Sequence, residues 1–184
     1  MASPKQKKLP LSDLGLRHPG VTKAYGDSLT EAAAVCLNRH HISPITLFAD
    51  IHGDQSECVT EWLAPDAQML RTYANDIDAT EAGAYGVSLA AIEALEGLVA
   101  VRRAETLTGA DFYVAPTGTD PDDLESCLRL EVSGVSSGGK AIVEARLKAK
   151  LKQTEAGKSN LPAIASVIGF KERLIAIAKM HEKS

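Results

Sequence analysis

The sequence predicts a mixed α/β domain in which helices flank a central sheet, and three runs of residues carry this prediction. Residues 108–114 and 128–134 are short, rich in aromatic and β-branched side chains, and bounded by Gly, Pro or Asp, which is typical of strands. Residues 161–170 form a continuous apolar run, which is typical of a strand buried on both faces. Helical spacing of apolar residues in the intervening segments predicts the flanking helices.

The composition is that of an ordinary soluble globular protein. The chain has 184 residues, 45% of them hydrophobic and 24% charged, which suffices to bury a core in one domain. No apolar run reaches membrane-spanning length and no apolar signal region follows the basic start, so we expect a cytoplasmic protein that does not bind a membrane. Cys36, Cys58 and Cys127 are widely spaced and indicate neither a disulfide framework nor a zinc site.

The first 75 residues are expected to form an extension in front of the core. Residues 1–26 are rich in Lys, Pro and Gly, which predicts a flexible tail followed by an irregular lead-in. Residues 27–184 are expected to form a single domain, of which residues 27–75 make a helix and a hairpin. Ser28 and Glu31 have the spacing of a capping box, so this helix is expected to begin at Ser28.

Turn-forming residues and the spacing of apolar residues predict a hairpin and two helices in the next part of the chain. Strand-like runs on both sides of the polar turn at 52–55 indicate the hairpin, and Pro65 opens a short second helix. A longer helix begins near residue 76 and is expected to run to about Arg103, with a break near Gly97.

The last part of the chain predicts a basic helix and a final amphipathic segment. Residues 141–154 have helical periodicity, with Val143, Leu147 and Leu151 in one apolar stripe. Residues 172–178 fit either a last helix or an edge strand.

Two acidic residues lie inside the predicted strands. Asp111 and Glu131 occupy mostly apolar segments, where a carboxylate is costly unless another group pairs with it. Because the connecting loop, Ala115 to Ser126, is rich in turn residues, the strands are expected to be antiparallel neighbours, which brings both acids to one edge of one site. Paired carboxylates are ordinary ligands of Mg²⁺. Two alternatives stay open: Asp111 caps the turn after Gly109, and Glu131 pairs with Arg129 or with a helix lysine.

A third acid, Glu81, lies near the start of the long helix. The helix is rich in Ala, Gly and Ser there, so we expect the sheet to approach its backbone closely and Glu81 to lie near the other two acids. Its alternative role is to complement the helix dipole from the first turn.

Charge is distributed unevenly along the chain. The net charge of −4 argues against a free-standing, sequence-independent DNA-binding protein. The first 139 residues carry 20 acidic and 10 basic residues, which suits contact with a protein partner or with a second copy of the chain, whereas the last 45 carry 4 and 10. The basic part predicts local nucleic-acid binding; the alternative is a solvated helix face. Its candidate residues are Arg146, Lys148, Lys150 and Lys152.

The order of these elements resembles the core of the PD-(D/E)xK restriction-endonuclease-like superfamily. The resemblance covers residues 76–170: a helix with Glu81, a strand with Asp111, a strand with Glu131, a basic helix and a buried strand. It implies a restriction-endonuclease-like mixed sheet flanked by helices. It further implies that Asp111 and Glu131 bind Mg²⁺ and that Glu81 joins them as the helix acid.

The sequence departs from the superfamily motif at its lysine. Ser133 stands at the lysine position of E-x-K, and the proline before Asp111 is missing. Some members carry the lysine on the following helix, where Lys140 and Lys148 are the candidates for a catalytic role. If neither reaches the acids, Ser133 indicates weak catalysis or binding without catalysis.

The resemblance implies a Mg²⁺-dependent nuclease, or a nuclease-like subunit of a nucleic-acid-processing system such as restriction or phage defence, acting on DNA or RNA. One alternative is a catalytically inactive adaptor on the same fold. A further alternative is a small-molecule or nucleotide-binding α/β protein that uses the Ser-Ser-Gly-Gly-Lys loop at 136–140, although this loop lacks the glycine spacing and terminal Ser/Thr of a P-loop. Backbone N–H groups of the loop could also hold a phosphate next to the acids; the alternative is a flexible connection.

Overall fold

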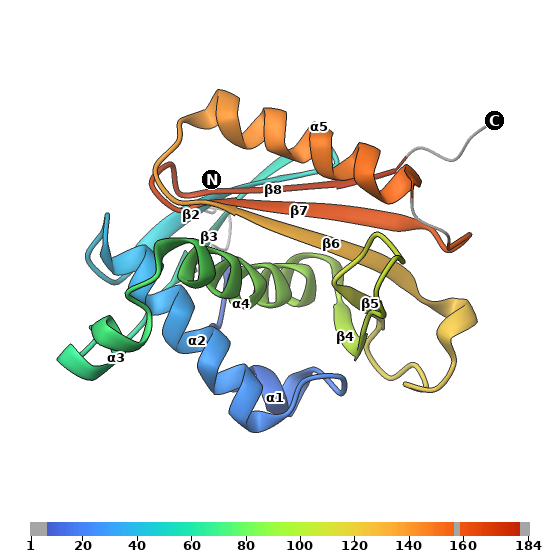
Figure 1. Ribbon diagram of the computed structural model, residues 1–184, viewed down its shortest axis with the longest axis horizontal. Coiled ribbons are helices and arrows are strands. Elements are labelled where there is room, and N and C mark those ends of the chain that lie inside the picture. The colour runs from blue at the N-terminus through green and yellow to red at the C-terminus, as the bar shows by residue number, and fades with distance from the viewer. Residues whose placement is uncertain (1–6, 157–158, 181–184) are drawn as a thin grey trace, which may run out of the picture.

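The computed structural model describes residues 7–156 and 159–180, and in this part of the chain the strands form one eight-stranded mixed sheet (Figure 1). The strand order is β1-β3-β2-β8-β7-β6-β5-β4. The strands are β1 (Lys7–Lys8), β2 (Ile45–Ile51), β3 (Asp54–Thr60), β4 (Leu98–Arg103), β5 (Phe112–Pro116), β6 (Leu128–Val135), β7 (Ala163–Gly169) and β8 (Leu174–Lys179).

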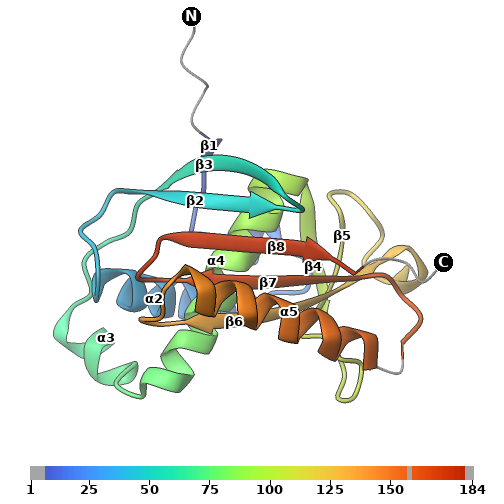
Figure 2. The same ribbon diagram turned by 90° about the horizontal axis from the view of Figure 1, so that it is seen from above.

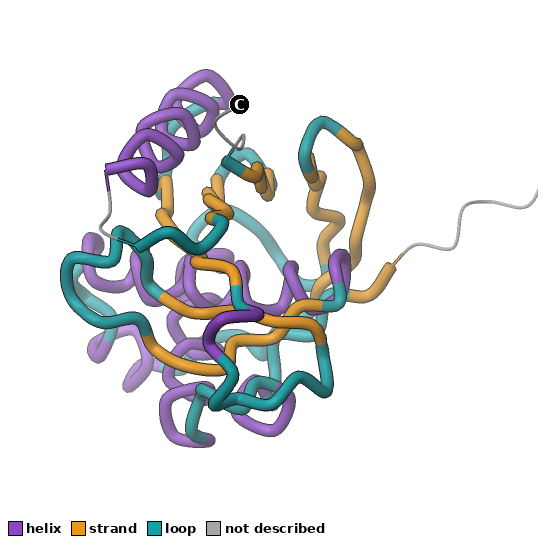
Figure 3. The backbone as a smooth tube through the Cα atoms, turned by 90° about the vertical axis from the view of Figure 1, so that its right-hand side faces the viewer, coloured by secondary structure: helices purple, strands orange, loops and turns teal. Residues whose placement is uncertain are grey.

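Helices cover both faces of the sheet unequally. The α-helices of the described residues are α1 (Leu14–Arg17), α2 (Lys23–Asn38), α3 (Ala67–Thr72), α4 (Asp76–Glu96) and α5 (Lys140–Ala156), with a 3₁₀ turn η1 at Leu124–Ser126. Helix α5 lies alone on one face, while α4, α2 and α1 lie on the other (Figures 1 and 2). The side view in Figure 3 shows the same separation.

The segment predicted to be the core has the order helix, three strands, helix, strand. Strands β4, β5 and β6 form an antiparallel meander, and α5 then crosses over to β7, which is parallel to β6. Every residue of β7 is buried, and β7 lies between β6 and β8. The predictions of a mixed α/β sheet and of a central strand within 161–170 are therefore confirmed.

The first long helix begins earlier than its sequence predicts. Helix α2 starts at Lys23, because the Thr22 hydroxyl accepts a hydrogen bond from the backbone N–H of Tyr25 at 3.3 Å and caps the first turn. Ser28 lies inside the helix, and its hydroxyl is 3.1 Å from that of Tyr73. The capping box predicted at Ser28 is wrong.

Two predicted boundaries near strands are also wrong. Helix α4 ends at Glu96, and its C-cap Gly97 has a φ of 69°, the left-handed conformation that ends helices, so the predicted break near Gly97 is confirmed. The predicted continuation to Arg103 is wrong, because Leu98–Arg103 forms β4. The segment 172–178 contains β8, which lies between β7 and β2 and is not an edge strand.

The N-terminal extension is part of the same sheet. The predicted hairpin is confirmed as β2 and β3, and β2 pairs in parallel with β8. The lead-in is more regular than predicted, since Lys7–Lys8 pair with β3 and α1 forms before α2. Residues 1–6 of the predicted flexible tail lie outside the described residues.

Glycines set the position of α4 between α2 and the sheet. A Cβ at Gly86 would lie 2.7 Å from the carbonyl oxygen of Leu29, so α2 packs directly on this turn of α4. A Cβ at Gly134 of β6 would lie 2.6 Å from the carbonyl oxygen of Thr80. The small residues predicted to admit the sheet thus admit both a helix and the sheet, and they bring the N-terminal half of α4 against β6.

Candidate functional site

The site lies where β5 separates from β6. The two strands pair only from Phe112 opposite Leu130 to Val114 opposite Leu128, and β6 then continues without a neighbour on that side. Asp111 comes just before β5, and its backbone N–H donates to the carbonyl oxygen of Leu130 at 2.8 Å. This hydrogen bond is one residue out of the register of the paired residues, in which Phe112 lies opposite Leu130, so the ladder is irregular at Asp111.

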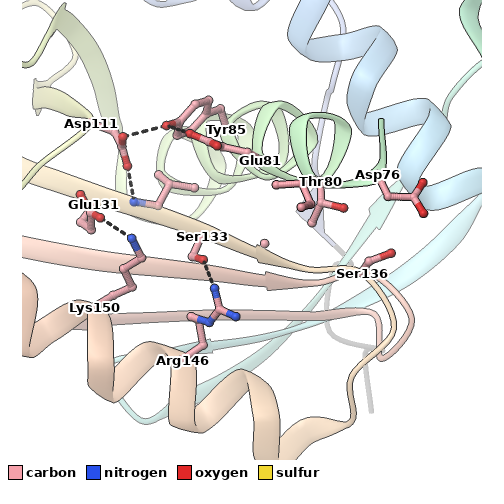
Figure 4. Close-up of a pocket in the computed structure, with 13 residues that line it drawn as sticks. Asp76, Thr80, Glu81, Tyr85, Asp111, Glu131, Ser133, Ser136, Arg146 and Lys150 are labelled. Atoms are coloured by element: carbon pink, nitrogen blue, oxygen red, sulfur yellow. Dashed lines mark hydrogen bonds and ion pairs between the residues drawn. The ribbon is translucent and has the colours of Figure 1, made fainter. Parts of the chain in front are cut away.

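The Asp111 side chain accepts a backbone N–H at the start of the edge of β6 that β5 leaves unpaired. Its Oδ2 accepts the backbone N–H of Val132 at 2.8 Å, and its Oδ1 accepts the Tyr85 hydroxyl at 2.7 Å (Figure 4). The Arg103 guanidinium lies 3.8 Å from Oδ1. These contacts explain the position of Asp111 better than the alternative of a cap on the turn after Gly109.

Glu131 is paired with α5. Its side chain is only 5% exposed, and Oε1 accepts hydrogen bonds from Lys150 Nζ at 2.6 Å and from Gln153 Nε2 at 3.0 Å. Burial raises the pKa of Glu131, and the neighbouring Asp111 carboxyl raises it further, whereas Lys150 opposes both effects. A helix lysine is therefore the partner of Glu131, as one sequence-based alternative held.

Arg129 is not that partner, although it lies on the same face of β6. It is 1% exposed and donates to the carbonyl oxygens of Thr108 at 2.7 Å, Thr154 at 3.1 Å and Leu161 at 3.0 Å. It thereby ties the loop before Asp111 to the end of α5, which carries Lys150.

The Tyr85 hydroxyl links the helix acid to the strand acids. It lies 2.8 Å from Glu81 Oε1 and 2.7 Å from Asp111 Oδ1, and with a single proton it donates to only one of them at a time. Burial raises the pKa of Tyr85, so it is the neutral phenol near neutral pH. The Arg103 guanidinium lies 4.6 Å from the centres of both the Tyr85 and Phe112 rings, which holds it beside Asp111.

Ser133 and Arg146 meet one step further along β6. Ser133 is buried, and Arg146 Nη1 lies 3.4 Å from its hydroxyl oxygen, a long contact for a hydrogen bond. Figure 4 shows this pair displaced from the Glu131–Lys150 pair toward Ser136.

A cavity of about 450 Å³ joins these groups. Its wall contains all three predicted acids together with polar side chains of α4, β6 and α5. The residues that line it are Asp76, Ile77, Thr80, Glu81, Tyr85, Asp111, Glu131, Val132, Ser133, Gly134, Ser136, Arg146 and Lys150. A second cavity of about 460 Å³, which extends to the loop at 104–110, shares Asp111 and Glu131 with the first. Asp111 and Glu131, called the acid pair below, therefore lie between two cavities.

The structure brings together some of the predicted site residues and leaves others outside. Glu81, Asp111, Glu131, Ser133, Arg146 and Lys150 line the first cavity. Lys140 is exposed and lies 3.8 Å from Glu144, and Lys148 and Lys152 are exposed on α5; none of the three lines the cavity. The lysine that reaches Glu131 is Lys150, which the sequence assigned only to nucleic-acid binding.

Three residues of the site have no counterpart in the sequence-based hypothesis. Tyr85, Arg103 and Gln153 contact the acids from α4, β4 and α5. Tyr85 is four residues after Glu81, which puts both side chains on one face of a helix and is a signal that the sequence contains. Arg103 and Gln153 are brought in by strand pairing and by the crossover of α5, for which the local sequence has no signal.

The two strand acids form a compact donor set and not a preformed metal cluster. Among the described residues, no group of three or more His, Cys, Asp and Glu side chains is arranged to hold a metal ion. Mg²⁺ commonly keeps several waters and binds through one or two carboxylates plus substrate phosphates, so two neighbouring carboxylates fit its chemistry. In the same part of the chain, no helix combines the length and the apolar character needed to cross a membrane.

Comparisons with protein-family models, with curated proteins and with solved structures find no match to this chain.

Proposed function

We propose that the chain is a Mg²⁺-dependent phosphodiesterase of the restriction-endonuclease-like type that hydrolyses nucleic acid. The observation that carries the proposal is the meeting of Asp111, Glu131 and Lys150 at the open edge of β6. The order α4, β4, β5, β6, α5, β7 supports it, because the superfamily that the sequence resembles carries its two acids on the second and third of these strands.

Each residue has a role that follows from its position. Asp111 and Glu131 would hold Mg²⁺ together with the substrate phosphate, and Glu81 stands behind them as a third carboxylate. When bound there, the ion would stabilise the negative charge that develops on the phosphate oxygens and would lower the pKa of a bound water.

Lys150 takes the position of the missing lysine of the motif. Its ammonium touches Glu131 from α5, so it lies within reach of a phosphate or water beside that carboxylate. There it would hold the attacking water by a hydrogen bond and add positive charge to the site. Ser133, at the E-x-K position itself, is neutral and adds no charge.

The same ion pair favours a second candidate function, a binding protein without catalysis. Lys150 and Gln153 satisfy Glu131, and Arg103 lies beside Asp111, so both acids already have cationic neighbours in the absence of metal. If no metal displaces these cations, the acids stay paired with them, and the protein acts as an adaptor without catalysis.

Metal titration separates the two functions. Isothermal calorimetry with MgCl₂ and MnCl₂ on the wild type and on Asp111→Asn is expected to show binding to the wild type and a loss of at least about 10-fold in affinity for the variant. Asp122→Asn, an exposed acid on the loop between β5 and η1, is the matched control. Hydrolysis of single- and double-stranded DNA and RNA, abolished in Asp111→Asn, would complete the case. A wild type that binds neither ion supports the adaptor.

A further inference from the structure

The cavity continues along β6 beyond the acids, and its far end has a different chemistry. Ser133, Gly134, Ser136 and Arg146 line this end, while Asp111 and Glu131 line the other. Residues on one face of a strand are about 7 Å apart at every second position, so Ser133 is one such step from Glu131.

Arg146 is the main charge at this end. No carboxylate lies within ion-pair distance of its guanidinium in the described chain, and its single hydrogen bond is the 3.4 Å contact with Ser133. A guanidinium has five N–H donors in a planar fork that matches phosphate oxygens, so most of its donors remain available to a ligand.

The backbone of β6 adds a donor. The N–H groups of Arg129 and Val132 point to opposite sides, toward Pro162 before β7 and toward Asp111, respectively. Because alternate residues of a strand direct their backbone groups to opposite neighbours, Gly134 directs its N–H to the same open side as Val132. Gly134 lines the cavity, so this N–H points toward the same space as Arg146.

Besides the acid pair, two acids line the cavity. Asp76 lies in the wall but is 79% exposed and pairs with Arg39 at 2.9 Å. Glu81 lies toward the other end and contacts the Tyr85 hydroxyl. The far end of the cavity therefore favours an anion, while the near end favours a cation.

We propose that Ser133, Gly134 and Arg146 form a binding subsite for the phosphate next to the one that lies at the acid pair. The assignment of the acid pair to a phosphate rests on the proposed function. The ligand is a phosphodiester chain with at least two phosphates, in DNA or in RNA, and the step of about 7 Å along β6 places one phosphate at each end of the cavity. Ser133 is then a phosphate-binding residue at the position where the motif has lysine.

Chain length tests the subsite. The affinities of TpT and TpTpT, which have one and two phosphodiesters, are measured by competition against a dye-labelled oligothymidylate, using fluorescence anisotropy in CaCl₂ and in EDTA. UpU and UpUpU distinguish RNA from DNA. The wild type is expected to bind the longer probe at least 10-fold more tightly, and Arg146→Gln is expected to lose most of this gain while retaining its affinity for TpT.

Two further variants make the result specific. Arg146→Lys keeps the charge but not the fork, and is expected to retain part of the gain. Arg71→Gln removes the same charge from exposed α3 and is expected to retain all of it. For a longer oligothymidylate, Arg146→Gln is expected to reduce the log–log slope of affinity against salt by about 0.7, the value for one phosphate contact on a single strand.

The outcomes separate this proposal from the proposed function. If Arg146→Gln loses the tighter binding of the longer probe and the wild type hydrolyses no nucleic acid, the subsite is supported and the proposed nuclease function is overturned. If the wild type hydrolyses nucleic acid and Arg146→Gln still binds the longer probe more tightly to the same extent, the nuclease function is supported and the subsite is overturned. A wild type that binds TpT and TpTpT equally, or binds neither, also overturns the subsite.

Discussion

The two faces of β6 are built differently although they belong to one strand. Leu130, Val132 and Gly134 face α4, where the two apolar side chains join the main core and the glycine allows close backbone packing. The alternate residues Arg129, Glu131 and Ser133 face α5 and meet polar partners. Strand alternation thus separates the residues that stabilise the fold from those that form the site.

The polar face has a thermodynamic cost that the apolar face offsets. A buried guanidinium, a buried carboxylate and a buried hydroxyl each lose hydration, and their hydrogen bonds to α5 recover only part of it. Substitutions on the two faces should therefore differ in kind: those facing α4 should lower stability, and those facing α5 should change binding and pH dependence.

The largest expected effect is on the α4 face. Leu130→Ala removes a fully buried side chain from the main core, and we expect the free energy of unfolding to fall by about 2–5 kcal/mol. Urea denaturation followed by circular dichroism measures this change. Mg²⁺ affinity of the folded protein should stay within about 3-fold of the wild type, and a large loss of affinity at full folding would contradict the separation of the two faces.

The next effect is on the ion pair. Lys150→Met leaves the buried Glu131 carboxylate with Gln153 as its remaining hydrogen-bond donor, so we expect a loss of about 1–3 kcal/mol in metal-free buffer. Added Mg²⁺ should restore part of this stability by binding the freed carboxylate. Lys148→Met, on the exposed side of the same helix, is the control for the change in charge. An equal loss in both variants would show that the Glu131 contact contributes nothing.

A smaller effect is on pH dependence. The pKa of Glu131 is raised in the folded protein, so the folded state binds more protons than the unfolded state between the unfolded pKa of about 4.3 and the folded value. This contribution to stability is fully present below that window and is lost as pH rises through it, with a slope of at most about 1.4 kcal/mol per pH unit.

Replacing the titrating carboxyl tests this sign. In EDTA, Glu131→Gln should gain stability relative to the wild type as pH rises from 4 to 7, as measured by urea denaturation at each pH. The exposed Glu125→Gln controls for removal of one acid. A relative loss of stability with rising pH would reverse the inferred direction.

The smallest expected effect is on the exposed lysines of α5. Lys148→Gln combined with Lys152→Gln should change the free energy of unfolding by less than about 0.5 kcal/mol, because both side chains are exposed. If these lysines contact phosphates of double-stranded DNA, the log–log salt slope of binding should fall by about 0.9 for each. An unchanged slope would assign them to solvated surface.

The sequence by itself predicted the elements of the core other than β4, together with its two strand acids. Clusters of aromatic and β-branched residues between breakers predict β5 and β6, and a continuous apolar run predicts β7, because both are properties of the local chain. The sequence also predicts the antiparallel pairing of β5 with β6, since two successive strands joined by a turn-rich loop favour such a pair, and this pairing is confirmed. Whether these acids bind metal remains a prediction.

Only the tertiary structure decided which cations complete the site. The sequence offered Lys140 and Lys148 for the position left open by Ser133, and the crossover of α5 instead brings Lys150 to Glu131 and Arg146 to Ser133. The rotation of a helix about its axis is set by the packing of the whole helix on the sheet. Lys148 and Lys150 are two residues apart, so they point about 200° away from each other around the axis of α5. The helical period fixes which residues of α5 share a face, whereas contact with β6 decides which face reaches the acids.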